Sequence, residues 1–127
     1  MTFCEEMKIA ISSYDELRCL HHALCEAKFH PDPDKKEIQG SPFVAETANK
    51  VFDLLISEAP SDQVSEEWRS HRILRANSMI LPAIKVRCDD WFAANDLTRE
   101  EKIDFLEDVA APYVLTDDLI TVILGAP

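Results

Sequence analysis

The sequence predicts an all-α protein, a compact single domain of five to six helices over residues 1–127. Only two glycines occur, whereas an average protein has about 7% glycine and β-rich folds need glycine in their tight turns. Seven prolines are spaced along the chain, and Ser or Thr repeatedly precedes apolar residues at helical spacing. The chain is long enough to bury a core without a disulfide or a metal ion.

The first dozen residues fit two patterns. Met7, Ile9 and Ile11 alternate as in a strand, but the same segment also fits one helix face with a capping box at Thr2 and Glu5. Because a lone strand cannot satisfy its backbone hydrogen bonds, we expect a helix here, with a short strand as the alternative.

A capping box at Ser13 and Glu16 begins the first clearly marked helix, which should run to Phe29 before His30-Pro31 stops it. Its predicted inward stripe is Leu17, Leu20, Leu24 and Ala27.

A polar loop over residues 31–40 should follow, and Ser41-Pro42 then begins a second helix that ends at Pro60. The predicted apolar face of this helix is Val44, Ala48, Val51, Phe52, Leu55 and Ile56.

A third helix is predicted from Ser61 or Ser65, through Trp68, towards Leu81. Pro82 either kinks it or begins a fourth helix. The fourth helix would carry Ile84, Cys88, Trp91 and Phe92.

Two shorter helices complete the prediction. Thr98 and Glu101 form a second capping box before a helix that ends at Pro112, and Thr116 caps a last helix that stops at Gly125. The residues that the first of these should bury are Ile103, Leu106 and Val109.

Charge is divided unevenly along the chain. No acidic residue lies between Trp68 and Cys88, a segment that carries a charge of +5, while the rest of the chain carries −16. On a helical wheel Arg69, Arg72 and Arg75 fall within about 120°, and Trp68 and Met79 share that face.

The basic face has three interpretations: pairing with the chain's own acids, a protein interface, or a nucleic-acid stripe. Arg, Trp and Met are enriched at protein interfaces, so an oligomerisation or adaptor face, including a homodimer, is the alternative function. We expect no direct nucleic-acid binding, because the net charge of −11 would repel phosphate.

The acidic surface favours a non-catalytic inhibitor that docks on a basic protein, such as a nuclease or another nucleic-acid-binding protein. Immunity proteins and phage anti-defence proteins are small acidic inhibitors of this class. The predicted partner-binding residues are Asp89, Asp90, Glu100, Glu101, Glu107, Asp108, Asp117 and Asp118.

The least favoured hypothesis is a metal-binding enzyme. His21, His22 and Cys25 could share one helix face and Cys19 points further round, but zinc sites draw four ligands from separate segments. Packing is the preferred role of the cysteines, with Cys19 and Cys25 partly buried and both histidines near the surface. We therefore expect no catalytic residues, no metal and no cofactor.

The sequence contains no apolar run near the roughly 20 residues of a membrane-spanning helix and no basic, apolar leader at its start. We expect a cytoplasmic protein with no membrane partner and with reduced cysteines.

Overall fold

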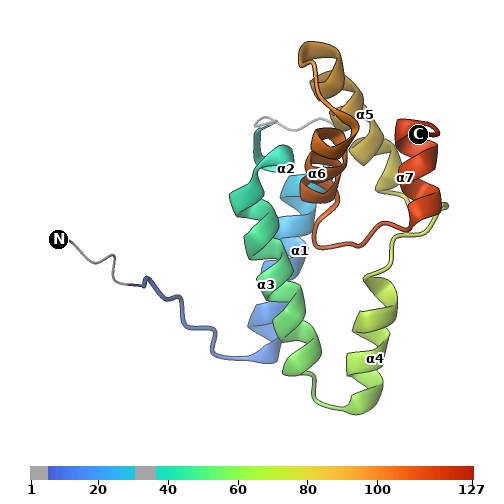
Figure 1. The fold of residues 1–127 in the computed structure, drawn as a ribbon. Helices are drawn as coiled ribbons and strands as arrows, with labels where there is room; N and C mark the ends of the chain where they lie inside the picture. The colour runs from blue at the N-terminus through green and yellow to red at the C-terminus, as the bar shows by residue number, and fades with distance from the viewer. Residues whose placement is uncertain (1–5, 31–36) are drawn as a thin grey trace.

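The computed structural model describes residues 6–30 and 37–127, in which there are seven helices and no strand (Figure 1). The helices are α1 (Tyr14–Phe29), α2 (Glu37–Gly40), α3 (Pro42–Ser57), α4 (Asp62–His71), α5 (Leu81–Ala94), α6 (Arg99–Ala110) and α7 (Asp117–Leu124). The all-α prediction is confirmed. The described part has more helices than the five or six expected, because α2 forms a single extra turn and α4 is separate from α5.

Side-chain caps begin five of the helices at predicted residues. In each, the Ser or Thr hydroxyl accepts a hydrogen bond from the backbone N–H three residues later, which satisfies one free donor of the first turn. The caps are Ser13, Ser41, Ser61, Thr98 and Thr116. The reciprocal capping box is complete in α6, where the Glu101 carboxylate accepts from the Thr98 N–H at 3.0 Å.

The N-terminal prediction is wrong over the part described. Residues 6–13 contain no helix and extend away from the other elements (Figure 1). The side chains of Met7 and Ile9 are almost fully exposed, and only Ile11, next to α1, packs against the cluster between α1 and α3. The predicted capping box at Thr2 and Glu5 lies outside the described residues, as do residues 31–36 of the predicted loop.

The predicted third helix also ends ten residues early, at His71 instead of near Leu81. After it, the Val114 N–H donates to the Arg72 carbonyl at 2.8 Å, and the Leu74 N–H donates to the Val114 carbonyl at 2.9 Å. Here the backbone forms hydrogen bonds with a segment distant in the sequence instead of continuing the helix. The local pattern of residues could not indicate this pairing. Pro82 stands in the first turn of α5, as expected of a helix start.

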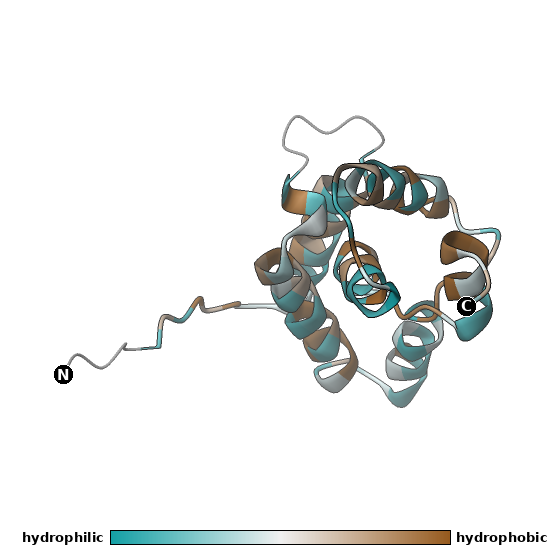
Figure 2. Ribbon diagram, turned by 45° about the horizontal axis from the view of Figure 1, so that its top comes forward, coloured by the Kyte–Doolittle hydropathy of each residue, from teal (hydrophilic) through white to brown (hydrophobic). Residues whose placement is uncertain are grey.

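The buried side chains form two clusters. The larger joins α5, α6 and α7 to the end of α1, and its buried members are Phe29, Leu74, Ile84, Cys88, Leu106, Val109, Ala110 and Leu119. The smaller joins α1 to α3 through Leu17, Val51 and Leu55. The other helices lie around α6 (Figure 2).

Candidate functional site

One face of α6 is strongly acidic. Five acids project from it within about 120° around the helix axis: Glu100, Glu101, Asp104, Glu107 and Asp108. The opposite side carries Leu106, Val109 and Ala110, all buried in the larger cluster. Four of the five acids were predicted contact residues. Asp104 was not predicted, because the prediction was based on adjacent acidic pairs. Asp104 has no acidic neighbour in the sequence and lies four residues after Glu100.

Three of these five acids neither cap the helix nor form an ion pair with a described residue. Glu100, Asp104 and Glu107 are exposed, and none of the four ion pairs among the described residues involves them. Glu101 instead serves the capping box, and its hydrogen bonds with Thr98 lower the pKa of its carboxyl. We call Glu100, Asp104 and Glu107 the α6 acidic face.

Asp108 marks the edge where this face meets the core. Its carbonyl accepts a hydrogen bond of 2.6 Å from the Nζ of Lys28, which is only 1% exposed and ties α1 to α6. Burial lowers the pKa of Lys28 to about 8 and raises the pKa of the half-buried Asp108 carboxyl. This contact is structural, because the ammonium group has no path to solvent.

The other predicted contact acids lie on two further helices. Asp89 and Asp90 are exposed in the middle of α5, which packs against α6, and Asp117 and Asp118 are exposed in the first turn of α7. Charge at α7 complements the positive end of that helix. The predicted set is thus distributed over three helices, with its densest part on α6.

The predicted basic face is not continuous. Trp68 and Arg69 lie in α4, but Arg72 caps its end, and Arg75 and Met79 follow in an irregular segment. Arg69 pairs with Glu66 in its own helix at 3.7 Å, where both side chains are exposed.

Arg72 turns towards the protein. Its guanidinium donates to Asp53 at 2.6 Å, to Asn49 at 3.3 Å and to the Pro112 carbonyl at 3.0 Å, and it lies 4.9 Å from the centre of the Phe52 ring. It therefore fastens the end of α4 to α3 and to the segment after α6. The interpretation in which the arginines pair with the chain's own acids holds for Arg72.

Trp68, Arg75 and Met79 meet instead at a cleft of about 530 Å³. Its lining comes from α1, α3, α4, the segment over residues 73–80, and Tyr113. Met79 is 95% exposed, and Ile73 is also exposed. Trp68, Arg75 and Met79, which are spread along the predicted helix, therefore line the same cleft.

His21 is the central side chain of the cleft. The prediction that it lies near the surface is wrong, since it is only 4% exposed. Its ring makes edge-on contacts with Phe52 at 5.3 Å and Trp68 at 5.4 Å. Burial, with a smaller effect from the neighbouring His22, lowers the pKa of His21 to about 4, so its imidazole is neutral in neutral solution.

Cys25 lies beside this histidine. Its Sγ is 3.7 Å from His21 Nε2 and 3.8 Å from the Tyr113 hydroxyl. Burial raises the pKa of the Cys25 thiol, and an imidazole with a pKa of about 4 is too weak a base to take its proton, so Cys25 stays a protonated thiol. Among the described residues, no group of three or more His, Cys, Asp or Glu is placed to hold a metal ion.

The remaining cysteines that the structure describes differ from each other. Cys19 is exposed on α1, contrary to the expectation of partial burial. Cys88 is fully buried in the larger cluster, as predicted for a packing residue, and burial raises the pKa of its thiol to about 12.

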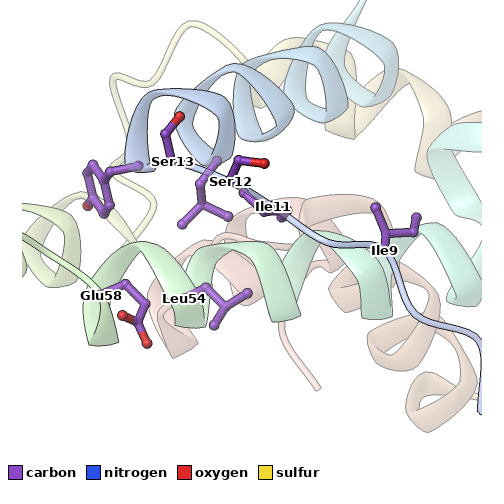
Figure 3. A pocket seen from close by; sticks show the side chains of 8 residues that line it. Ile9, Ile11, Ser12, Ser13, Leu54 and Glu58 are labelled. Atoms are coloured by element: carbon purple, nitrogen blue, oxygen red, sulfur yellow. The ribbon is translucent and has the colours of Figure 1, made fainter.

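A second hollow, of about 460 Å³, lies between the N-terminal segment and α3 (Figure 3). Among the described residues, its apolar lining comes from Ile9, Ile11, Leu17 and Leu54, and its polar lining from Ser12, Ser13, Tyr14 and Glu58. None of the described residues that line it is a histidine, a cysteine or a cation.

The chain matches no protein-family model, no curated protein and no solved structure. Among residues 6–30 and 37–127, no helix has both the length and the apolar character needed to cross a membrane.

Proposed function

We propose that this chain is a non-catalytic binding protein of the inhibitor type, which docks its acidic surface on a basic, nucleic-acid-processing protein. The observation that carries the proposal is the α6 acidic face. Its three carboxylates are exposed on one helix side and take part in none of the ion pairs among the described residues.

Such a face suits a partner whose own site binds phosphate. Uncompensated charges on one side of a molecule steer an oppositely charged partner during diffusional encounter, and they repel acidic competitors. Carboxylates along a helix can approach the Arg and Lys side chains that line a nucleic-acid cleft.

The backbone beneath the face is held in place before binding. Leu106 and Val109 are buried on the other side of α6, and Thr98 caps its start. A charged surface on a fixed helix loses little conformational entropy when a partner docks, so more of the electrostatic attraction contributes to affinity.

The test is a pull-down from host lysate with the wild-type chain and the variant Glu100→Gln/Asp104→Asn/Glu107→Gln. We expect the wild type to retain a basic partner, which about 0.5 M salt should release because exposed charges are then screened within a few ångströms. The triple variant should lose at least about tenfold in affinity for that partner, since each lost charge contact weakens association.

The matched control is Glu46→Gln/Glu66→Gln/Glu67→Gln, which removes the same charge from exposed positions on α3 and α4. It should retain the partner. Equal losses in both variants would show that only net charge matters, and a neutral or acidic partner that survives high salt would contradict the proposal.

A further inference from the structure

The cleft beside α4 differs in charge from the rest of this acidic chain. None of the fourteen described residues that line it is Asp or Glu. Its floor is aromatic: His21, Phe52 and Trp68 contact one another edge to face, and Phe52 also contacts Tyr113 at 6.1 Å. Phe52 and His21 are buried, so the partly exposed Trp68 and Tyr113 are the rings that a flat apolar group could contact.

Polar groups in the cleft have unused hydrogen-bonding capacity. The nearest polar partner of both the His21 ring nitrogens and the Tyr113 hydroxyl is the same atom, Cys25 Sγ, at 3.7–3.8 Å. Sulfur is a weak donor and a weak acceptor, so these contacts satisfy the imidazole and the phenol poorly. A ligand oxygen or N–H reaching this point would replace weak partners with a stronger one.

The cleft also holds a cation available for pairing. Arg75 is exposed in the segment between α4 and α5, and it belongs to none of the ion pairs found among the described residues. His22 and His71 are exposed and also contribute to the lining. With no carboxylate among the described lining residues, the charged end of a ligand is favoured only if it is negative.

We propose that the cleft binds a small aromatic carboxylate, with its ring against Trp68 and Tyr113 and its carboxylate paired with Arg75. The volume of about 530 Å³ falls in the range of roughly 300–1,000 Å³ found for small-ligand sites. This size and the inward aromatic floor favour a small molecule over a protein surface. The inference does not depend on the α6 acidic face.

The probes are 3-phenylpropionate and 3-phenylpropylamine, which share a ring and differ in the sign of their charge. A ¹H–¹⁵N correlation spectrum contains two indole N–H signals, from Trp68 and Trp91, and the Trp91→Phe variant assigns them. We expect the carboxylate to shift the Trp68 signal and the amides of residues 73–80, and the amine to cause no saturable shift.

Arg75→Gln should weaken binding of 3-phenylpropionate by about fivefold or more, since it removes the charged partner and leaves the aromatic floor. Arg69→Gln is the matched control: it removes the same charge from a neighbouring exposed position that does not line the cleft, and affinity should be unchanged. Folding of both variants is checked by circular dichroism.

Four results of the binding experiments would overturn the inference. They are equal shifts with the amine, shifts confined to the surroundings of Trp91, no saturation up to about 10 mM probe, and wild-type affinity in Arg75→Gln. A dimer in light scattering that dissociates on Met79→Glu would also overturn it, since the occupant would then be a second copy of this chain.

Discussion

The α6 acidic face and the cleft beside α4 differ in how the chain builds them. The acidic face is one regular helix, so Glu100, Asp104 and Glu107 come together through helical spacing alone. The cleft draws its side chains from α1, α3, α4, an irregular segment and Tyr113, and it exists only when these parts are packed.

Because of this difference, the charge of the α6 acidic face can be changed without changing the packing of the core. Exposed carboxylates on α6 can vary with little effect on the fold, because water solvates them and the other side of the helix is buried. In the cleft, recognition and stability share the same side chains: Phe52 and His21 line it and are also buried. Substitutions should therefore separate binding from folding on α6 more easily than in the cleft.

The largest effect is expected at the floor of the cleft. Phe52 is 0% exposed and contacts His21, Trp68 and Tyr113, so Phe52→Ala should lower the free energy of unfolding by about 3–5 kcal/mol in urea titrations. Phe43→Ala, on the same helix but at a site 80% exposed, should cost less than about 0.5 kcal/mol. Similar costs for the two would mean that the floor is not tightly packed.

An intermediate effect depends on pH through His21. Its pKa is about 4 in the folded protein and 6.5 ordinarily, so between these values the unfolded chain binds a proton that the folded protein excludes. The stability associated with neutral His21 is present above pH 6.5 and is lost as the pH falls towards 4, by on the order of 3 kcal/mol.

The measurement is the free energy of unfolding of the wild type and of His21→Phe across this pH range. Acid titration of the carboxylates is common to both proteins, so the difference between the two curves isolates the histidine. Parallel curves would show that His21 is not held neutral in the folded protein.

The smallest effect is expected on the α6 acidic face. Asp104→Asn/Glu107→Gln should change stability by less than about 0.5 kcal/mol, because both side chains are exposed and make no ion pair with the described residues. Leu106→Ala, in the same helix but fully buried, should cost about 2–5 kcal/mol in the same thermal and urea experiments. If Asp104→Asn/Glu107→Gln lowered the free energy of unfolding by more than about 1 kcal/mol, the α6 acidic face and the cleft would not differ in how much they contribute to stability.

Most helix starts could be predicted because their causes are local. Ser13, Ser41 and Thr98 cap helices through hydrogen bonds to residues three positions away, so a short stretch of sequence contains the whole cause. The acidic face of α6 is local in the same sense. Asp104 could have been found by reading acids at helical spacing.

The cleft could not be predicted because its causes are distant in sequence. The end of α4 depends on backbone hydrogen bonds between Val114 and residues 72–74, and the burial of His21 depends on rings from α3 and α4. A helical wheel assumes that the helix continues, so it placed Arg75 and Met79 on a face that ends at His71. Helical spacing could have separated the two histidines, because His21 lies four residues after Leu17 and three before Leu24, while exposed His22 lies on the other side of α1.

Lys28 gives this fold an internal chemical reporter. Its side chain is 1% exposed and its Nζ donates to the Asp108 carbonyl of α6, so an acylating reagent in solution can reach it only when this packing opens. With a pKa of about 8, its amine also loses a proton more readily than an ordinary lysine. The rate at which Lys28 becomes acylated, resolved by mass spectrometry from the exposed lysines, therefore reports how often the α1–α6 junction opens under native conditions.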